Sequence, residues 1–164
     1  MSTLRRLYHE RVYAPDSEPE HIILAAENNL ANIYEMIERF DCALRLRQDV
    51  YSGNLKLLGE ESVHTLGVAI CYASMLQCLK RFEEAKLVLR KTLPVARRVL
   101  GESNDITLRI KWTEAWGLYK DAGATLGDLR EAVKTLEEIE RTARHVCGGA
   151  HPLVVRIEFC LKEA

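Results

Sequence analysis

The sequence predicts an all-α fold, an α-solenoid of antiparallel helix hairpins, and three observations lead to this prediction. A Leu-Gly or Cys-Gly pair recurs at Gly59, Gly101 and Gly148, with spacings of 42 and 47 residues. Apolar residues between these glycines recur at helical spacing, and no segment alternates apolar and polar residues as a strand would. A fixed period of this length is typical of repeat proteins, in which each hairpin buries its apolar face by stacking on its neighbours.

The period divides the chain into successive units. We expect complete units at residues 18–59, 60–101 and 102–148, and residues 149–164 as the first helix of a partial fourth unit. Each complete unit is expected to fold as two antiparallel helices joined by a short turn. Together with the N-terminal residues, these units make the whole chain, 1–164, a single repeat domain.

Residues 1–17 are expected to form an N-terminal capping helix. Their apolar side chains recur at helical spacing, and the segment aligns with the second helix of a repeat. These apolar residues are Leu4, Leu7, Tyr8 and Val12.

The third unit is expected to carry a five-residue insertion. Ala73 and Ala115 keep the 42-residue step, whereas Ala85 and Ala132 are 47 residues apart, so the insertion falls between the two helices of the unit. Thr125 with an acidic residue three positions later forms a capping-box pattern, which predicts a helix that begins near Leu126. Ser17 with Glu20 forms the same pattern and predicts a helix that begins near Pro19.

Composition and charge narrow the possible functions. The formal net charge of −1 leaves no excess of cations for binding nucleic acid. Residues 63–79, the longest stretch without a charged side chain, are too short and too polar for a membrane span. We therefore expect no membrane association, and a cytoplasmic protein with reduced cysteines. Nucleotide-binding and zinc-protease motifs are absent from the sequence, so we expect no enzyme activity, cofactor or metal.

Two short motifs resemble the tetratricopeptide repeats of kinesin light chain, whose units are 42 residues long. Residues 28–31 read Asn-Asn-Leu-Ala, and residues 147–152 read Cys-Gly-Gly-Ala-His-Pro, close to that family's Leu-Gly-x-x-His-Pro joint. The resemblance implies a right-handed superhelix whose first helices line a concave groove. It also implies that the groove binds another protein or a peptide.

Equivalent positions of the first helices predict the residues of this groove. Side chains at 3-4-3 spacing share one helix face, and the face recurs every 42 residues. Amides and small polar groups there could bond a peptide backbone, and the cations could meet an acidic group. The candidate groove residues are Asn29, Asn32, Cys71, Ser74, Arg109, Thr113, Trp116 and Lys120.

Some of these residues have a simpler interpretation. Asn29 and Asn32 could merely solvate a helix face or bond between neighbouring helices. Trp112 and Trp116 lie four residues apart on one helix, a spacing more typical of core, and we expect Trp112 to be core while Trp116 remains open.

Two functions fit a chain of this kind. The first is an adaptor that holds a peptide or a partner helix along the groove. The alternative is a non-catalytic structural lobe of a larger protein, because residues 142–161 also resemble the helical tail of SET and MYND methyltransferases.

The C-terminal segment predicts a further contact. Residues 152–161 carry apolar side chains on nearly every side of one helix, which favours burial all round. We expect a homodimer through this helix, unless a longer chain supplies the missing cover.

Overall fold

The computed structural model describes residues 20–149 and 151–163. This described part forms seven α-helices and contains no strand, which confirms the predicted all-α fold. The expected helix over residues 1–17 lies outside the described residues. The helices are α2 (Glu20–Met36), α3 (Phe40–Leu58), α4 (Val63–Cys78), α5 (Phe82–Leu100), α6 (Asp105–Lys120), α7 (Leu126–Cys147) and α8 (Pro152–Glu163).

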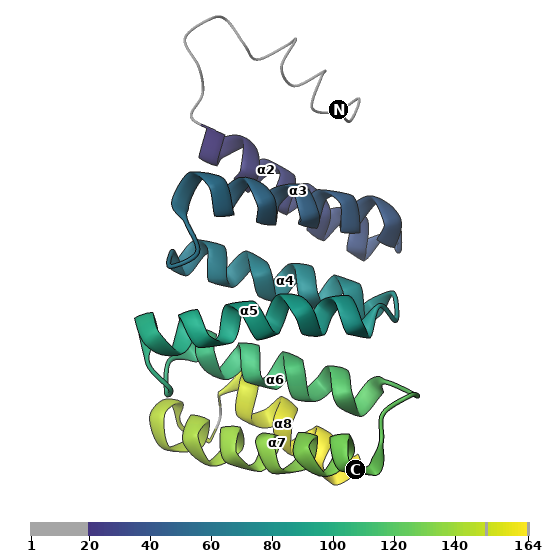
Figure 1. Cartoon of the computed structure of the whole chain (residues 1–164), viewed down its shortest axis with the longest axis vertical. Helices are drawn as coiled ribbons and strands as arrows, with labels where there is room; N and C mark the ends of the chain where they lie inside the picture. Colours follow the sequence, from purple (N-terminus) through teal and green to yellow (C-terminus); the bar gives the residue numbers. More distant parts are fainter. Residues whose placement is uncertain (1–19, 150, 164) are drawn as a thin grey trace, which may run out of the picture.

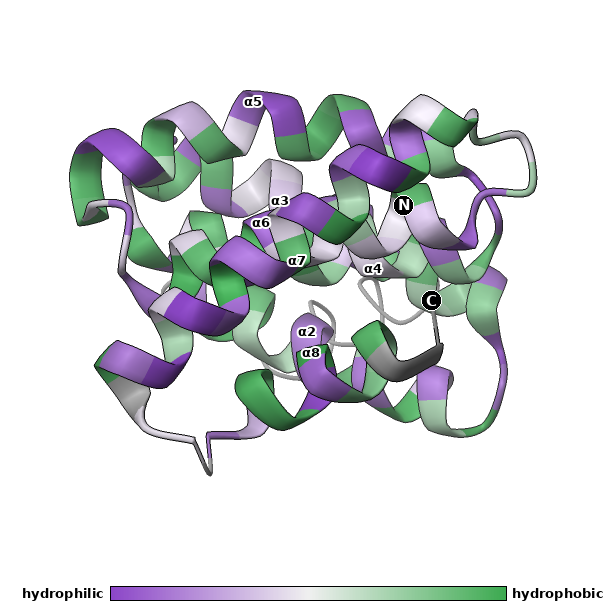
Figure 2. Ribbon diagram, turned by 90° about the horizontal axis from the view of Figure 1, so that it is seen from below, coloured by the Kyte–Doolittle hydropathy of each residue, from purple (hydrophilic) through white to green (hydrophobic). Residues whose placement is uncertain are grey.

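The helices stack in chain order, each one packed on the next (Figure 1). The pairs α2/α3, α4/α5 and α6/α7 are antiparallel hairpins, and the first helices α4 and α6 also touch each other directly. In a view along the stack, α5 lies at one edge while α2 and α8 lie toward the opposite edge (Figure 2). The assignment of one repeat unit to each hairpin stays a prediction.

Each second helix ends at a glycine, as the repeat predicts. Gly59, Gly101 and Gly148 have φ angles of 78°, 89° and 84°. These angles lie in the region that only glycine enters without strain, so the repeated glycine has a backbone reason. The first helices of the later units begin at side-chain caps, where Ser62 and Asn104 accept a hydrogen bond from the backbone N–H two residues on.

The five-residue insertion divides between a loop and a helix. The loop from α6 to α7 has five residues, 121–125, whereas the equivalent loops 37–39 and 79–81 have three. Helix α7 has 22 residues, whereas α3 and α5 have 19 each. Thr125 caps α7 through a capping box with Asp128, and the helix begins at Leu126 as predicted.

Small residues set the close approach within each hairpin. Ala43, Ala85 and Ala132, at equivalent positions of the three second helices, are at most 1% exposed. Gly53 has a similar role, since a Cβ at this position would lie 2.5 Å from the Leu24 side chain. Any larger residue there would push α3 away from α2.

Helix α8 buries only one side. Leu153, Val154 and Ile157 are at most 6% exposed and pack with α6 and α7, whereas Val155 and Phe159 are 53% and 61% exposed. The apolar residues on every side of this helix therefore leave an uncovered face at the end of the stack. Among the described helices, none is long and apolar enough to cross a membrane.

Candidate functional site

The first helices α4, α6 and α8 line an open hollow of about 360 Å³. This size is within the range of ligand-binding sites. The helices bring together polar and charged side chains from three successive units. The side chains that matter for binding are those of Ser74, Arg109, Trp112, Thr113, His151 and Arg156.

Two arginines dominate the charge of the hollow. A step of 47 residues takes Arg109 on α6 to Arg156 on α8, so the two side chains hold equivalent positions in consecutive units. Arg109 lies 3.9 Å from the carboxylate of Asp105, at the outer limit of an ion pair. Within the described residues, no hydrogen bond or ion pair engages the Arg156 guanidinium. The N–H donors of Arg156 are therefore available for an anionic or carbonyl ligand group.

The Trp112 ring contacts the Arg156 guanidinium. The Arg156 guanidinium carbon lies 4.3 Å from the centre of the Trp112 ring. This distance is that of a cation–π interaction. Trp112 is 9% exposed, as expected for a core residue, and its indole nitrogen has no hydrogen-bond partner within the described part of the chain.

An aromatic stack runs along α6 away from the hollow. Trp112 and Trp116 stack with ring centres 5.7 Å apart and planes 11° apart, and Tyr119 continues the row. The Lys120 ammonium lies 4.5 Å from the centre of the Trp116 ring. Trp116 is half-buried and packs against a core cluster with residues from α6, α7 and α8.

Three of the predicted groove residues line the hollow, namely Ser74, Arg109 and Thr113. One expectation about them is wrong, because the Thr113 side chain does not reach solvent. Thr113 is 1% exposed, and its hydroxyl donates a hydrogen bond of 2.8 Å to the Arg109 carbonyl oxygen. A hydroxyl that follows this helical pattern serves its own helix and leaves no donor for a ligand.

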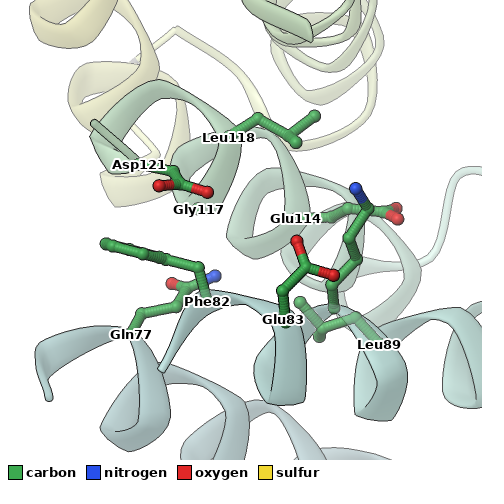
Figure 3. A pocket seen from close by; sticks show the side chains of 9 residues that line it. Gln77, Phe82, Glu83, Leu89, Glu114, Gly117, Leu118 and Asp121 are labelled. Carbon is green, nitrogen blue, oxygen red and sulfur yellow. The ribbon is translucent and has the colours of Figure 1, made fainter. Parts of the chain in front are cut away.

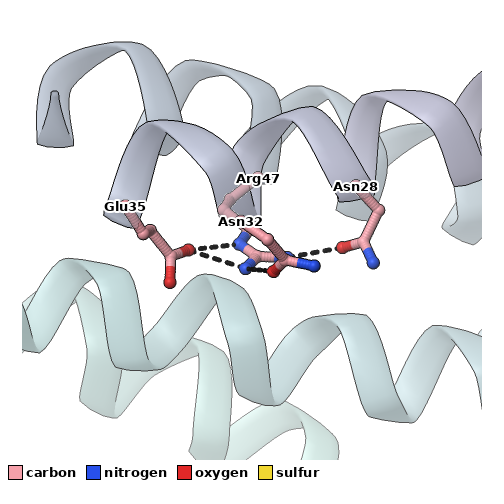
Figure 4. A network of polar contacts seen from close by, with 4 residues as sticks. All are labelled: Asn28, Asn32, Glu35 and Arg47. Carbon is pink, nitrogen blue, oxygen red and sulfur yellow. Dashed lines mark hydrogen bonds and ion pairs between the residues drawn. The ribbon is translucent and has the colours of Figure 1, made fainter. Parts of the chain in front are cut away.

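Asn32 bonds between helices, as its simpler interpretation predicts. Arg47 on α3 is 4% exposed and donates hydrogen bonds to the side-chain oxygens of Asn28, Asn32 and Glu35 on α2 (Figure 4). The cluster satisfies a buried cation with one carboxylate and two amide oxygens. It links the two helices of the first hairpin, and Asn32 remains an exposed residue of α2.

The remaining predicted residues lie apart from the hollow. Asn29 is exposed on α2, and Cys71 is half-buried on α4, but neither lines the hollow. Trp116 and Lys120 belong to the aromatic stack described above. The structure thus gathers only the part of the predicted row that lies nearest α8.

Sequence reasoning missed Arg156 and His151. The signal for Arg156 was present, because the insertion sets the step from the third unit to the fourth at 47 residues, and Arg109 lies 47 residues earlier. Extending the row into the partial unit would have identified it. His151 offers no comparable signal, since its place at the hollow depends on the turn before α8.

A second hollow lies on another side of α6, between α6 and the hairpin α4/α5 (Figure 3). Gln77 points to Gly117 there and donates a hydrogen bond of 2.7 Å to the Thr113 carbonyl oxygen. Gly117 is required for this approach, because a Cβ would lie 2.4 Å from the Gln77 side-chain nitrogen. Glu114 lies half-buried at the other end of this hollow, and burial raises the pKa of its carboxyl.

The described residues contain no group of three His, Cys, Asp or Glu side chains that could hold a metal ion. The polar side chains that line the hollow can form hydrogen bonds and ion pairs with a ligand.

Comparisons with known proteins agree with this fold. A family model described as tetratricopeptide repeat matches residues 68–105. A search of curated proteins finds no match.

Solved structures with the same fold include kinesin-light-chain-like repeat proteins. The putative kinesin light chain of Podosopora anserina, with nearly identical TPR-like repeats, is 19% identical with a TM-score of 0.68, over 96% of this chain and 71% of that chain. A point variant of that protein is 18% identical with a TM-score of 0.71, over 96% and 70% of the two chains. BtubC (BKLC) from P. vanneervenii is 13% identical with a TM-score of 0.56, over 97% and 68%.

The described helices therefore form an α-solenoid whose fold is similar to that of kinesin-light-chain-like repeat structures, and residues 68–105 match a tetratricopeptide repeat. Repeats of this type are in general scaffolds for protein interaction and are typically non-catalytic.

Proposed function

We propose that this protein is a non-enzymatic adaptor that binds an extended peptide or a partner helix along its first helices, with the hollow between α4, α6 and α8 as the anchoring site. The observation that carries the proposal is the pair Arg109 and Arg156, which hold equivalent positions of consecutive units and line one hollow. Their N–H donors have few partners within the described residues. The ligand carries an acidic group, since two guanidinium ions favour a carboxylate.

Charges near the hollow also favour a ligand that carries an acidic group. Helices α6 and α8 both begin at the hollow, with Asp105 and Pro152 in its wall, so the positive ends of two helix dipoles lie there. Asp105 offsets part of this charge, and its place beside Arg109 leaves Arg156 as the stronger anchor. Ser74 on α4 adds a hydroxyl that can bond the peptide backbone.

A peptide-display selection tests the proposal. The full chain is used to select from a library of random twelve-residue peptides, and the dissociation constant of the enriched peptide is then measured by fluorescence anisotropy. We expect enriched peptides to carry Asp or Glu. Arg156→Glu is expected to weaken binding by about 10- to 100-fold, the effect of losing a charged hydrogen bond and adding repulsion.

Arg130→Glu is the matched control, because it makes the same charge change at an exposed position of α7 outside the hollow. It is expected to leave affinity within about twofold. If Arg130→Glu weakened binding as strongly as Arg156→Glu, the ligand would be responding to overall charge, and the proposed site would be wrong.

We also propose that the protein forms a homodimer through residues 152–161 and acts in the cytoplasm, without nucleic acid or membrane partners. Val155 and Phe159 on the outer face of α8 support the dimer. Their equivalents one unit earlier, Leu108 and Trp112, are 1% and 9% exposed, so this position is one that the repeat normally covers. Light scattering at micromolar concentration is expected to show a dimer that Phe159→Glu converts to a monomer. A wild-type monomer at high micromolar concentration would contradict it.

A further inference from the structure

An apolar stripe on α2 lies uncovered at the N-terminal end of the stack. Ala26, Leu30, Ile33 and Ile37 follow one another at 4-3-4 spacing along one side of the helix and the turn after it. Ile33 and Ile37 are 53% and 57% exposed. Both are large aliphatic side chains, and an uncovered pair of this kind marks an interaction surface.

The equivalent stripe on the next first helix is covered. A step of 42 residues takes Ala26 and Ile33 to Val68 and Met75 on α4, which are 7% and 3% exposed. Helix α3, the second helix of the preceding unit, packs on α4, and its Leu44 belongs to the same core cluster as Met75. The repeat therefore places a covering helix immediately before each first helix, and for α2 that place belongs to residues 1–19.

We propose that the chain's own N-terminal segment, through Leu4, Leu7, Tyr8 and Val12, packs onto the stripe of α2 and closes this end of the stack. These four side chains recur at helical spacing, so they form one apolar side. A 42-residue step takes Leu4, Tyr8 and Val12 to Leu46, Val50 and Asn54 of α3, which are 8%, 1% and 2% exposed. These three residues thus match buried positions of α3, whereas Leu7 matches the exposed Asp49.

Connection lengths also fit this occupant. The links between one unit and the next, residues 59–62, 101–104 and 148–151, each have four residues. A 42-residue step back from Leu58, the last residue of α3, falls at Asp16, which leaves three residues, 17–19, before α2. Because the segment is tethered to α2, its effective concentration at the stripe is on the order of millimolar, which favours it over a free partner or a second copy.

The cover decides how copies of the chain can assemble. With the stripe of α2 closed, the apolar face around Val155 and Phe159 is the open end of the stack, and a contact between two such ends closes as a twofold pair. If the stripe were uncovered, the α2 end of one copy could bind the α8 end of the next, and repeated contacts of this kind would form a fibre. This consequence rests on the proposed homodimer, whereas the cover itself does not.

Thiol labelling in the full chain tests the cover. Cysteine is placed at Ile37 in one variant and at Leu87 in another, and the rate of alkylation at each new site is followed by peptide mass mapping. Ile37 and Leu87 are 57% and 59% exposed in the described structure, so their accessibility is matched. We expect Ile37→Cys to react at least about tenfold more slowly than Leu87→Cys, because burial protects a thiol.

A second set of variants removes apolar side chains that are proposed to cover the stripe. The changes Leu4→Gln and Tyr8→Gln, made together in the Ile37→Cys chain, are expected to raise its labelling rate to that of Leu87→Cys. Ile33→Cys serves as a second reporter should Ile37→Cys fail to fold. Peptide binding at the hollow is expected to be unchanged in these variants, so a failure of the cover is distinguishable from a failure of the proposed function.

Three outcomes would overturn the proposal. Equal labelling of Ile37→Cys and Leu87→Cys would show that the stripe is uncovered. Protection that persists after the changes at Leu4 and Tyr8 would show that another segment covers it. Protection that falls on dilution would assign the cover to a second copy of the chain.

Discussion

The crevice lined by α3, α4 and α5 is small, whereas the equivalent crevice one unit later, lined by α5, α6 and α7, is larger and charged. Tyr51 lines the first crevice from α3 and stacks on Tyr72 of α4, with ring centres 5.7 Å apart. In the second crevice, the equivalent residues are Leu93 and Glu114. The two crevices have volumes of about 110 and 470 Å³ respectively.

The difference shows what a repeat fixes and what it leaves free. Helix positions recur, because the glycine turns and the small residues at helix crossings recur. The filling of each crevice depends on a few side chains, and here the walls also change, since Leu55 and Ala69 of the first crevice correspond to Arg97 and Lys111 of the second. Glu102 bonds both Arg97 and Lys111, so charge replaces ring packing at this joint.

Replacing Tyr72 with glutamate, the residue found at the equivalent position 114, has the largest expected effect on stability. Tyr72→Glu removes the stacked ring and places a carboxylate among apolar neighbours, so the free energy of unfolding is expected to fall by about 2–3 kcal/mol. Urea denaturation measures this loss. Tyr72→Phe is the matched control and keeps the stack. A loss below about 0.5 kcal/mol in Tyr72→Glu would mean that the rings do not stabilise the joint.

The partner ring is expected to contribute less. Tyr51→Leu reproduces the residue found at the equivalent position, Leu93, and keeps an apolar contact while it removes the aromatic pair. An aromatic pair contributes about 0.5–1.5 kcal/mol beyond its buried area, so the expected loss is about 1 kcal/mol. Combining Tyr51→Leu with Tyr72→Leu should cost less than the sum of the two single changes, because both singles remove the same pair.

The reverse change in the larger crevice is expected to stabilise the protein. Glu114 is half-buried, and burial is the main cause that raises the pKa of its carboxyl. Glu114→Leu removes this desolvation cost and adds apolar contact, so the free energy of unfolding at pH 7 is expected to rise by about 0.5–1.5 kcal/mol. Thermal denaturation checks the sign. A destabilised variant would show that the nearby cations at Arg90 and Arg97 outweigh the burial of the carboxylate.

Measuring the free energy of unfolding at several pH values tests the Glu114 carboxyl and has the smallest expected effect. A folded-state pKa that is raised means that the folded protein holds this proton more tightly than the unfolded chain, so stability falls as pH rises above the usual Glu range. The stability difference between Glu114→Gln and wild type is expected to grow from pH 4 to pH 7 and then level off, by less than about 1 kcal/mol. A pH-independent difference would contradict the raised pKa of Glu114.

The candidate site was less predictable from sequence than the fold. The predicted row of first-helix positions includes Ser74 and Arg109, which line one hollow, because helical spacing and the 42-residue step together fix which residues share a face. The same row could not show that Arg47, from another helix, binds the Asn32 oxygen. It also could not show that Thr113 turns its hydroxyl to its own helix.

The sequence by itself determined the helices, their turns and the place of the insertion, because glycine at positive φ, helix caps and apolar spacing are local properties of the chain. Only the tertiary structure decided which polar side chains remain open to a ligand. The division of the insertion into two loop residues and three helix residues also needed the structure. These outcomes depend on contacts between residues far apart in sequence, such as Arg156 on Trp112 and Gln77 on Gly117, and periodicity does not encode those contacts.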